Sequence, residues 1–518
     1  MFKHTLIALA IGTVTATSMT AFAQSNLDSS HYTNPKPVVI ADTVKQAMTL
    51  APLTSAVAGV QSSNEITIKQ AGAVFIKVHF SHFNLPAGAY VTVSDLTGKE
   101  SYRYDGQDHK SATFSASAGE NGLNQFAAMS VFGDTAIVKL IVPPGVVWQK
   151  QHAIKVDKFN AGSSEDSLAD KAAQAQAISP VLDVVGSEPF SSCGVNERRD
   201  VACWSSSHPV EYARTSPVAR LLMAGSGLCT GWRASDTNRM FTNNHCLDNQ
   251  DRLENTEIWF NYQADTCNGT VDNSKVVKVT GKDLLKTNYQ LDYTLFTVND
   301  FAQVTSFGHF GLDPRAPELG EIIYIPQHGA GNPKELAIES DQNVGGLCRI
   351  DVASAYGRAA DTDTGYFCDT TGGSSGSPVL AGSSNKVIAL HHFGGCENKG
   401  VKIERIWPEV AEFFRPTPPG GQAPVARGTV SCTNLSCEFD GSDSSDSDGT
   451  IVDYSWSINN NVINGVKVQH TFASAGTYNV YLKVADDSGL TNTQAQTVTV
   501  TEAVSEFPQA DIAGSQGE

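Results

Sequence analysis

The sequence predicts an all-β protein built from three successive β units. Its apolar runs are short and alternate with polar residues, and Gly, Asp and Pro separate them, which is typical of strands joined by turns. A length of 518 residues exceeds what one hydrophobic core usually serves, so several domains are expected. Two stretches with linker-like composition, residues 160–187 and 416–423, divide the chain between these units.

The first unit is expected within residues 24–187. Residues 24–65 are polar and rich in Ala, Ser and Thr, so we expect them to be loosely ordered. From about residue 65 to 147, short alternating runs such as Ala136–Val142 recur, and a small β-sandwich is their simplest arrangement. The following stretch to residue 187 is expected to be a linker that is partly helical.

The amino terminus predicts export. Lys3 and His4 precede an apolar run from Leu6 to Val14, and Ala21–Ala23 supplies a small-x-small cleavage site, so residues 1–23 are expected to be a signal peptide. No later stretch is long and apolar enough to cross a bilayer. A secreted protein without a membrane partner is therefore expected.

Charge and cysteine content narrow the function classes. Lys and Arg total 36 against 54 Asp and Glu, a net charge of −18, and no dense basic patch offsets it, so nucleic acid is not an expected partner. All ten cysteines follow residue 190, and an even count in an exported chain predicts up to five disulfides. No CxxC pair or close Cys/His cluster occurs, so neither a metal site nor a cofactor is expected in the middle unit.

The middle unit, residues 188–415, contains three short patches that predict nucleophilic catalysis. They carry His245, Asp292 and Ser375, in that order. A serine hydroxyl is a weak nucleophile at neutral pH, and it needs an imidazole to take its proton and an acid to orient that imidazole. The chain order His, Asp, Ser is similar to that of the chymotrypsin fold, which implies that His245 and Asp292 lie on a first barrel and Ser375 on a second, with the site between them.

The glycines around the predicted nucleophile have a role of their own. They allow backbone N–H groups to turn toward one point, so the amides of Gly373 and Ser375 are expected to form an oxyanion hole. Each such donor contributes roughly 3–4 kcal/mol to transition-state stabilisation in other enzymes.

A rival motif overlaps this patch. Gly372-x-Ser374-x-Gly376 also matches the nucleophile elbow of α/β-hydrolases. That fold requires the order Ser, acid, His on a strand, a turn and a helix. Here a strand-like run at Val387–Leu390 follows, and helices are scarce, which disfavours a lipase or esterase.

With these patches in view, the segment from about 190 to 415 resembles the trypsin-like peptidase superfamily, and it is most similar to the bacterial glutamyl and lysyl endopeptidases. The resemblance implies a chymotrypsin-like double β-barrel and a serine endopeptidase acting through an acyl-enzyme on protein or peptide substrates. The shared segments are His245-Cys246, Phe260-Asn261-Tyr262-Gln263, Asp292-Tyr293-Thr294-Leu295, Gly373-Ser374-Ser375-Gly376-Ser377-Pro378 and Gly394-Gly395-Cys396.

The same resemblance implies disulfides. By similarity to lysyl endopeptidases, the expected bridges are Cys193–Cys396, Cys203–Cys267 and Cys229–Cys246. These leave Cys348 and Cys368, which are expected to pair with each other close to the substrate pocket, while Cys432 and Cys437 are expected to close a short loop in the third unit.

Substrate preference is inferred from Asp369, six residues before the nucleophile, where trypsin-like enzymes place the base of the specificity pocket. A partly desolvated carboxylate there would pair with a Lys or Arg side chain, so cleavage after basic residues is expected. The alternatives are a turn-capping role for Asp369 and glutamyl-type specificity, which Thr370, His391 and His392 resemble. The expected pocket residues are Asp369, Thr370, His392, Phe393, Gly394 and Gly400.

The segment also departs from these families. Thr371 stands where lysyl endopeptidases carry an acid, so strict lysine selectivity does not follow. In trypsin, the N-terminus formed on activation makes an ion pair with an aspartate just before the nucleophile. Ser374 stands at that position here and cannot make such a pair, so activation by this ion pair is not expected. The first unit resembles the N-terminal extensions of secreted trypsin-like proteases, which implies a propeptide in a zymogen, or a retained chaperone-like domain.

The third unit, residues 424–501, resembles a PKD domain, an immunoglobulin-like sandwich, with Trp456 as the core aromatic residue. Such modules imply binding of a polymeric substrate. The acidic cluster from Asp440 to Asp448 has the composition of a calcium site, but solvated turn acids are the preferred interpretation. Residues 502–518 are expected to be a frayed tail. The alternative for the whole chain is a non-catalytic binding protein on a protease scaffold.

Overall fold

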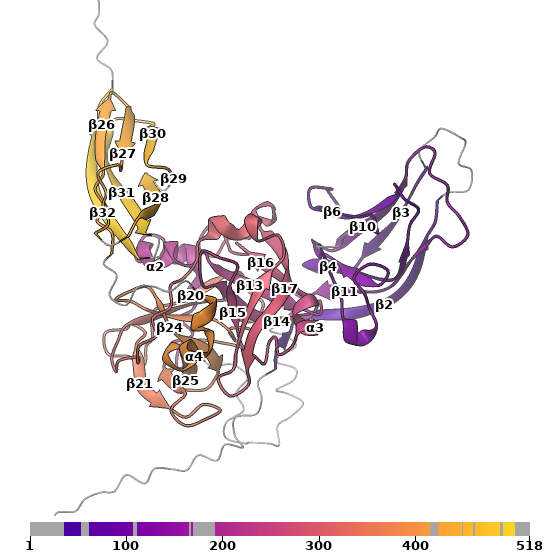
Figure 1. The fold of residues 1–518 in the computed structure, drawn as a ribbon, viewed down its shortest axis with the longest axis horizontal. Coiled ribbons are helices and arrows are strands. Elements are labelled where there is room, and N and C mark those ends of the chain that lie inside the picture. The colour runs from indigo at the N-terminus through magenta and orange to yellow at the C-terminus, as the bar shows by residue number, and fades with distance from the viewer. Residues whose placement is uncertain are drawn as a thin grey trace, which may run out of the picture.

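A computed structural model describes residues 36–52, 62–106, 111–164, 167–168, 192–414, 423–447, 449–458, 461–486 and 490–502 (Figure 1). The predicted signal peptide at 1–23, most of the linker at 160–187, residues 416–422 and nearly all of the expected tail lie outside these ranges. The described part is mostly β-structure in three units, as the sequence predicts. In Figure 1 the two smaller units lie on different sides of the middle unit.

The N-terminal unit is a β-sandwich of two antiparallel sheets, ordered β3-β10-β5-β6 and β2-β11-β4-β8-β7, with β9 beside β4. The side chains between the sheets, among them Phe80, Phe83 and Phe126, form its buried core. Its strands are β2 (Ala41–Leu50), β3 (Ser62–Lys69), β4 (Phe75–Asn84), β5 (Tyr90–Asp95), β6 (Ser101–Tyr104), β7 (Ala112–Thr113), β8 (Phe126–Ala128), β9 (Val131–Phe132), β10 (Thr135–Val142) and β11 (Ala153–Gly162). The short strand β1 (Val38–Val39) precedes them and pairs with the middle unit instead.

The extent of this unit corrects the sequence prediction. The expected bounds of about 65–147 are too narrow, because β2 and β11 belong to the sandwich and pair from Ile154↔Leu50 to Gly162↔Ala41. Residues 38–50, which lie in the stretch expected to be loosely ordered, form β1 and β2. Most side chains of β2 face solvent, so the segment has a polar composition although its backbone pairs with β11 along one edge.

The middle unit begins with a closed barrel of six antiparallel strands, ordered β14-β13-β16-β17-β18-β15, in which β15 also pairs with β14. Closure leaves no free edge over most of its length and encloses a core of its own. Its strands are β13 (Val218–Met223), β14 (Gly227–Arg233), β15 (Met240–Thr242), β16 (Thr256–Phe260), β17 (Val277–Asn288) and β18 (Tyr293–Val298), with helices α2 (Pro209–Ala213) and α3 (Gln250–Glu254) in the connections.

A second barrel follows in the order β19-β23-β24-β25-β22-β21. Hydrogen bonds from Ile350 N to Glu321 O (2.8 Å) and from Ile323 N to Cys348 O (3.0 Å) join its last strand to its first. Helix α4 (Ile403–Val410) then ends the unit at the place where the sequence predicts a closing helix. The strands are β12 (Arg199–Asp200), β19 (Ile323–Gln327), β20 (Glu335–Ala337), β21 (Ile350–Ala355), β22 (Asp363–Tyr366), β23 (Pro378–Ala381), β24 (Val387–Phe393) and β25 (Asn398–Lys402).

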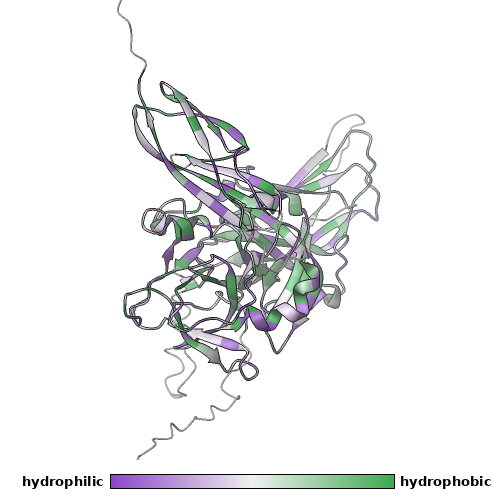
Figure 2. Cartoon of the chain, turned by 60° about the vertical axis from the view of Figure 1, so that its left-hand side comes forward, coloured by the Kyte–Doolittle hydropathy of each residue, from purple (hydrophilic) through white to green (hydrophobic). Residues whose placement is uncertain are grey.

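The C-terminal unit is the predicted second sandwich, with sheets β26-β27-β30 and β29-β28-β31-β32 around Trp456 and Phe439. Figure 2 shows green and purple residues alternating along its long strands, the pattern of a sheet with one face in the core. The strands are β26 (Thr429–Thr433), β27 (Ser436–Asp440), β28 (Ile451–Ile458), β29 (Asn461–Asn464), β30 (Lys467–Thr471), β31 (Gly476–Asp486) and β32 (Thr491–Val500).

All five expected disulfides are present. They join Cys193 to Cys396, Cys203 to Cys267, Cys229 to Cys246, Cys348 to Cys368 and Cys432 to Cys437. Among the described residues, no helix combines the length and the hydrophobicity that crossing a bilayer would require.

Candidate active site

Strand pairing brings His245 and Asp292 together although they are 47 residues apart. His245 follows β15 and Asp292 immediately precedes β18, and these strands pair at Thr242↔Thr294. Asp292 accepts two hydrogen bonds from His245, one from its backbone N (3.0 Å, to Oδ1) and one from Nδ1 (2.8 Å, to Oδ2). Both residues are buried. The second bond directs the other ring nitrogen, Nε2, away from the carboxylate.

Asp292 has further partners that no sequence motif indicated. Arg358 Nη1 lies 3.2 Å from Oδ1, and His392 Nδ1 lies 3.1 Å from Oδ2. Burial alone would raise the pKa of Asp292, but the charges and hydrogen bonds of His245 and His392 outweigh it and hold the pKa well below its usual range. The carboxylate is therefore ionised at neutral pH.

His392, an expected pocket residue, has both ring nitrogens bonded to carboxylates. Its side chain is completely buried, Nδ1 bonds to Asp292, and Nε2 bonds to Asp363 Oδ2. Burial would lower the pKa of His392, but Asp363 and Asp292 together raise it to about 9. The ring is therefore an imidazolium held between two carboxylates at neutral pH.

Asp363 lies on β22, 29 residues before its histidine, and nothing in its local sequence indicated this role. Space for its carboxylate depends on Gly357. A β-carbon at that position would come within 2.0 Å of Asp363 Oδ1, so any larger residue there would displace the carboxylate.

The loop that carries Ser375 depends on two glycines in the left-handed region, Gly373 (φ 97°) and Gly376 (φ 90°). A β-carbon on Gly373 would lie 2.5 Å from Leu228 Cδ2, and one on Gly376 would lie 2.1 Å from the carbonyl oxygen of Thr230. Thr230 N donates to Ser375 O (2.8 Å), which fixes the loop against β14. These contacts attach the second-barrel loop to the first barrel.

Ser374 points away from the site and into a neutral hydrogen-bond network. Its hydroxyl oxygen accepts a bond from Thr371 N (3.0 Å), and the hydroxyl donates to Gln327 Oε1. Gln327 in turn donates to the backbone oxygen of Asp369 (2.9 Å). The loop is thus held without the ion pair that trypsin uses at this position, as the replacement by serine predicts.

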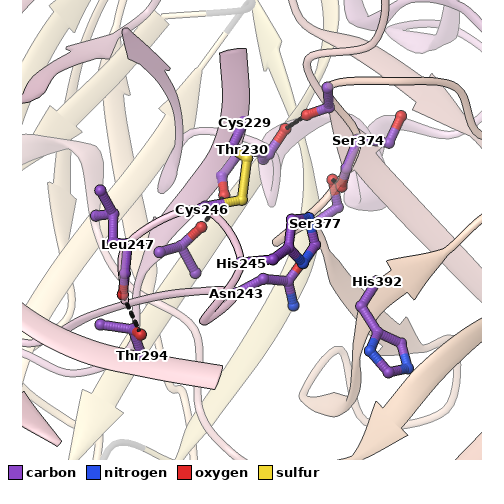
Figure 3. The surroundings of a disulfide bond; sticks show 12 residues. Cys229, Thr230, Asn243, His245, Cys246, Leu247, Thr294, Ser374, Ser377 and His392 are labelled. Carbon is purple, nitrogen blue, oxygen red and sulfur yellow. Dashed lines mark hydrogen bonds between the residues drawn. A yellow bond between two sulfur atoms is a disulfide. The ribbon is translucent and has the colours of Figure 1, made fainter. Parts of the chain in front are cut away.

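The groups available for chemistry lie around His245. Within the described part of the chain, its Nε2 is buried and has no hydrogen-bond partner. In Figure 3 its ring lies between the Cys229–Cys246 disulfide and the segment that carries Ser374 and Ser377. Ser375 is partly exposed, and no hydrogen bond joins its hydroxyl to Nε2 in this structure. Such bonds often tighten only when substrate is bound.

The two expected oxyanion donors are not used elsewhere. Among the described residues, the backbone N–H groups of Gly373 and Ser375 make no hydrogen bond, whereas Ser374 N and Ser377 N are occupied by Thr371 O and Ser374 O. Free amides at this turn are what an oxyanion would require.

Asp369 is buried, and each of its carboxylate oxygens accepts a backbone N–H, from Cys193 (2.9 Å) and from Glu197 (2.7 Å). Burial is the largest influence on the Asp369 carboxyl group and raises its pKa. These bonds tie the start of the protease unit to the segment before the nucleophile. Both carboxylate oxygens therefore bind backbone amides outside the Thr370–Thr371 turn, so these contacts differ from the turn cap that the sequence offered as an alternative, and each oxygen keeps unused lone pairs.

The remaining predicted pocket residues lie in the second barrel. Thr370 donates its hydroxyl to Asn398 Oδ1 (3.0 Å), and Phe393 ends β24 just before Gly394. Gly400 lies in β25, where a β-carbon would be 3.1 Å from the Tyr366 hydroxyl. That hydroxyl is also 2.8 Å from His391 Nδ1.

One group in the described chain has metal-like composition, because ligand atoms of Cys229, His245 and Cys246 lie within 4.8 Å of one another. The two sulfurs are bonded to each other, so neither is a thiolate. This group does not fit a zinc site.

Two closed six-stranded barrels, with a His–Asp pair on the first and a Gly-rich serine loop on the second, are the architecture of the trypsin-like proteases. Residues 191–402 match the family model of the lysyl endopeptidase C-terminal domain, and residues 421–501 match that of the PKD domain. The chain belongs to this family of trypsin-like proteases of the lysyl endopeptidase type, and its protease domain is followed by a PKD domain.

Individual proteins are similar to different parts of the chain. The chain is 30% identical over 347 residues to the secreted RxLR effector protein 73 of Plasmopara viticola, covering 64% of this chain and 78% of that protein. Among solved structures, a Glu endopeptidase in complex with MPD is 17% identical and covers 43% of this chain and 98% of its own, with a TM-score of 0.30. The PKD1 domain of Vibrio anguillarum Epp is 34% identical over 16% of this chain and 100% of its own, with a TM-score of 0.16.

Proposed function

We propose that this protein is a secreted serine endopeptidase in which Ser375 is the nucleophile, His245 the general base and Asp292 the group that orients the base. The observation that carries the proposal is the His245 imidazole. Its Nδ1 is bonded to Asp292, and its Nε2 is buried without a partner among the described residues. A buried ring nitrogen without a partner is costly unless another molecule or a moving hydroxyl uses it.

The proposed reaction has two halves. Ser375 Oγ attacks the carbonyl carbon of the scissile peptide bond while its proton passes to His245 Nε2, and the negative oxygen is bound by the amides of Gly373 and Ser375. His245 then gives the proton to the leaving nitrogen, and the C–N bond breaks to leave an acyl-enzyme. A water molecule repeats the sequence, so that the acid product leaves and Ser375 regains its proton. The ionised Asp292 stabilises the imidazolium in both halves.

The test is covalent labelling of the full chain with a fluorophosphonate, which reacts only with an activated serine. We expect one label on the tryptic peptide that contains Ser375, none in Ser375→Ala, and strongly slowed labelling in His245→Ala. Ser377→Ala is the matched control, because the Ser377 hydroxyl donates to the backbone oxygen of Ser374 (2.6 Å). An unlabelled wild-type chain would refute the proposal and favour a non-catalytic binding protein.

For substrate preference, we propose cleavage after Lys or Arg. Asp369 supplies a buried negative charge in the segment before the nucleophile. A pocket that binds the glutamate side chain of a substrate would need a positively charged group or a hydrogen-bond donor without another partner. His392 is committed to Asp292 and Asp363, while burial and then the charges of His392 and His245 lower the pKa of His391 to about 3, which keeps it neutral. Mapping the cuts that the purified chain makes in a denatured protein mixture tests this, and a majority after Glu would refute it.

Secretion is proposed from the predicted signal peptide, and five disulfides are typical of oxidising compartments. Sequencing the N-terminus of protein recovered from culture medium tests it, with a start after residue 23 or later expected.

We further propose that the PKD domain binds polymeric protein substrate. Tyr481 is 42% exposed on β31, and an aromatic residue on an open sheet face is a common contact for extended polymers. Co-sedimentation of the full chain with insoluble protein fibres, with and without Tyr481→Ala, measures this binding.

A further inference from the structure

The N-terminal unit reaches the protease through a short strand that extends the first barrel. β1 pairs antiparallel with the free edge of β14, with Val38 opposite Leu228 and Val39 opposite Gly227. Ile40 N then donates to Ser226 O (2.8 Å). The opposite edge of β14 is already occupied by β13. A free strand edge offers unpaired backbone groups to any extended chain, and here residues 38–40 of the same protein use them.

This edge lies beside the candidate active site. Leu228 packs against Gly373, since a β-carbon there would be 2.5 Å from Leu228 Cδ2. The next residue, Cys229, is joined to Cys246, the neighbour of His245 in the chain. A peptide bound at residues 227–228 would therefore run past both the oxyanion loop and the catalytic histidine. Ser375 keeps partial exposure while the edge is covered.

An apolar interface holds the strand in place. Ile40, Phe75 and Phe132 from the N-terminal unit pack with Leu228 and Trp259 from the first barrel, and all five are buried. The Trp259 ring makes edge-on contacts with Phe75 and Phe132, at centroid distances of 5.5 and 5.2 Å. Stable interfaces typically bury aromatic and aliphatic side chains from both partners, as this one does.

The interface also contains a buried ionic centre. Glu257 on β16 pairs with Lys77 of the N-terminal unit, and both side chains are almost fully buried. Its carboxylate also accepts bonds from Ser130 N (2.9 Å), Ser130 Oγ (2.7 Å) and Trp259 Nε1 (2.8 Å). A buried pair with all its hydrogen bonds filled specifies one docking geometry, since any other leaves a charge without a partner.

We propose that the N-terminal unit inhibits the protease unit by occupying, with residues 38–40, the β14 edge that an extended substrate segment would use beside the active site. The inference rests on the proposed function. A backbone group cannot bond two strands at once, so protein substrates compete with β1 for Gly227 and Leu228. Small substrates that do not reach this edge do not compete with β1, and Ser375 itself is partly exposed. Release of the N-terminal unit exposes the edge to extended peptides.

The experiment compares two substrates on the full chain, a short chromogenic amide with a single basic residue and a fluorescently labelled casein. The variant is Ile40→Pro, which removes the N–H that bonds Ser226 O together with a buried apolar side chain. Rates are expressed per active site, counted by fluorophosphonate labelling. The matched control is Val39→Ala, whose side chain is 65% exposed and whose backbone pairing is unchanged.

We expect Ile40→Pro to raise casein hydrolysis per labelled site by about tenfold or more, because a lost hydrogen bond and a lost buried side chain together exceed one factor of ten in binding. Amide hydrolysis should stay within about twofold of wild type, since that substrate does not reach the strand. Val39→Ala should match wild type on both substrates.

Equal casein rates in Ile40→Pro and wild type would overturn the inference while leaving the proposed function intact. Absence of labelling in wild type would instead refute the proposed function. If Ile40→Pro is not labelled whereas wild type is, Ile40→Ala replaces it, because this variant keeps the backbone hydrogen bond. Its casein hydrolysis per labelled site should rise by about threefold or more, because buried apolar area is lost. A synthetic peptide of residues 36–44 should then inhibit casein hydrolysis by Ile40→Ala and leave amide hydrolysis unchanged; inhibition of both substrates, or of neither, would contradict the assigned edge.

Discussion

Replacing His392 with Asn tests whether the imidazolium behind the triad supports the protease unit. His392 faces Asp292 and Asp363 directly. The other titratable groups that act on it or on its partners include His391, His245, Arg358 and Tyr366. Asn keeps a donor that reaches Asp292 but carries no charge and is too short to reach Asp363. The variant therefore removes the cation while leaving the His245–Asp292 contact in place.

The pKa shift sets the expected magnitude. The pKa of His392 rises from 6.5 to about 9 on folding. At 1.36 kcal/mol per unit, the charged form contributes about 3 kcal/mol to the free energy of unfolding. Because the folded pKa is raised, this contribution is complete below pH 6.5, declines between pH 6.5 and 9, and is absent above about pH 9.

The measurement is urea-dependent hydrogen exchange of peptides from residues 387–402, which reports on the second barrel alone, at several pH values from 6 to 10. The difference between wild type and variant is needed, because other groups titrate in the same window. Burial lowers the pKa of Lys334 to about 7, which makes stability rise with pH where His392 makes it fall.

We expect the wild-type advantage over His392→Asn to be about 3 kcal/mol near pH 6 and to vanish above about pH 9. His391→Asn is the control. The pKa of His391 is lowered to about 3, so its replacement should not change the pH dependence in this range. A wild-type advantage that stays constant with pH would refute the assignment of a buried cation at His392.

Three further predictions concern the loop, the pocket and the C-terminal domain. Gly373→Ala forces a β-carbon to within 2.8 Å of His328 O at a φ of 97°, so we expect kcat/KM for the short amide to fall by about a hundredfold or more, with an unchanged far-ultraviolet spectrum. Asp369→Asn should reduce kcat/KM for basic substrates by about ten- to a hundredfold relative to neutral ones, and an equal loss on both would assign Asp369 a capping role only. Trp456→Ala should cost the PKD domain about 3–5 kcal/mol in calorimetry without changing amide hydrolysis, because that side chain is confined to the C-terminal core.

The sequence by itself was enough for the three-unit all-β architecture and the PKD sandwich, and it named the three residues of the proposed triad. Local signals carry these features: strand alternation, turn residues, and short motifs such as the glycine-rich loop around Ser375. The disulfide pairs also followed from the sequence. Three came through its resemblance to lysyl endopeptidases, Cys348–Cys368 by elimination, and Cys432–Cys437 from their short separation in the third unit. These features depend on residues that are close in the chain or on motifs with one chemical meaning.

Tertiary structure decided what depends on residues far apart in sequence. Asp363 reaches His392, which itself bonds to Asp292, only because the second barrel pairs β22 with β25 and β25 with β24. Arg358 reaches Asp292 from the loop before β22. The place of β1 on β14 was equally hidden, because its residues are too few to form a recognisable strand pattern and their partner lies in another domain. A short segment of sequence indicates which backbone conformation it prefers and whether its side chains are polar or apolar. A contact between barrels or domains depends on how distant segments pack together, so no short segment predicts it.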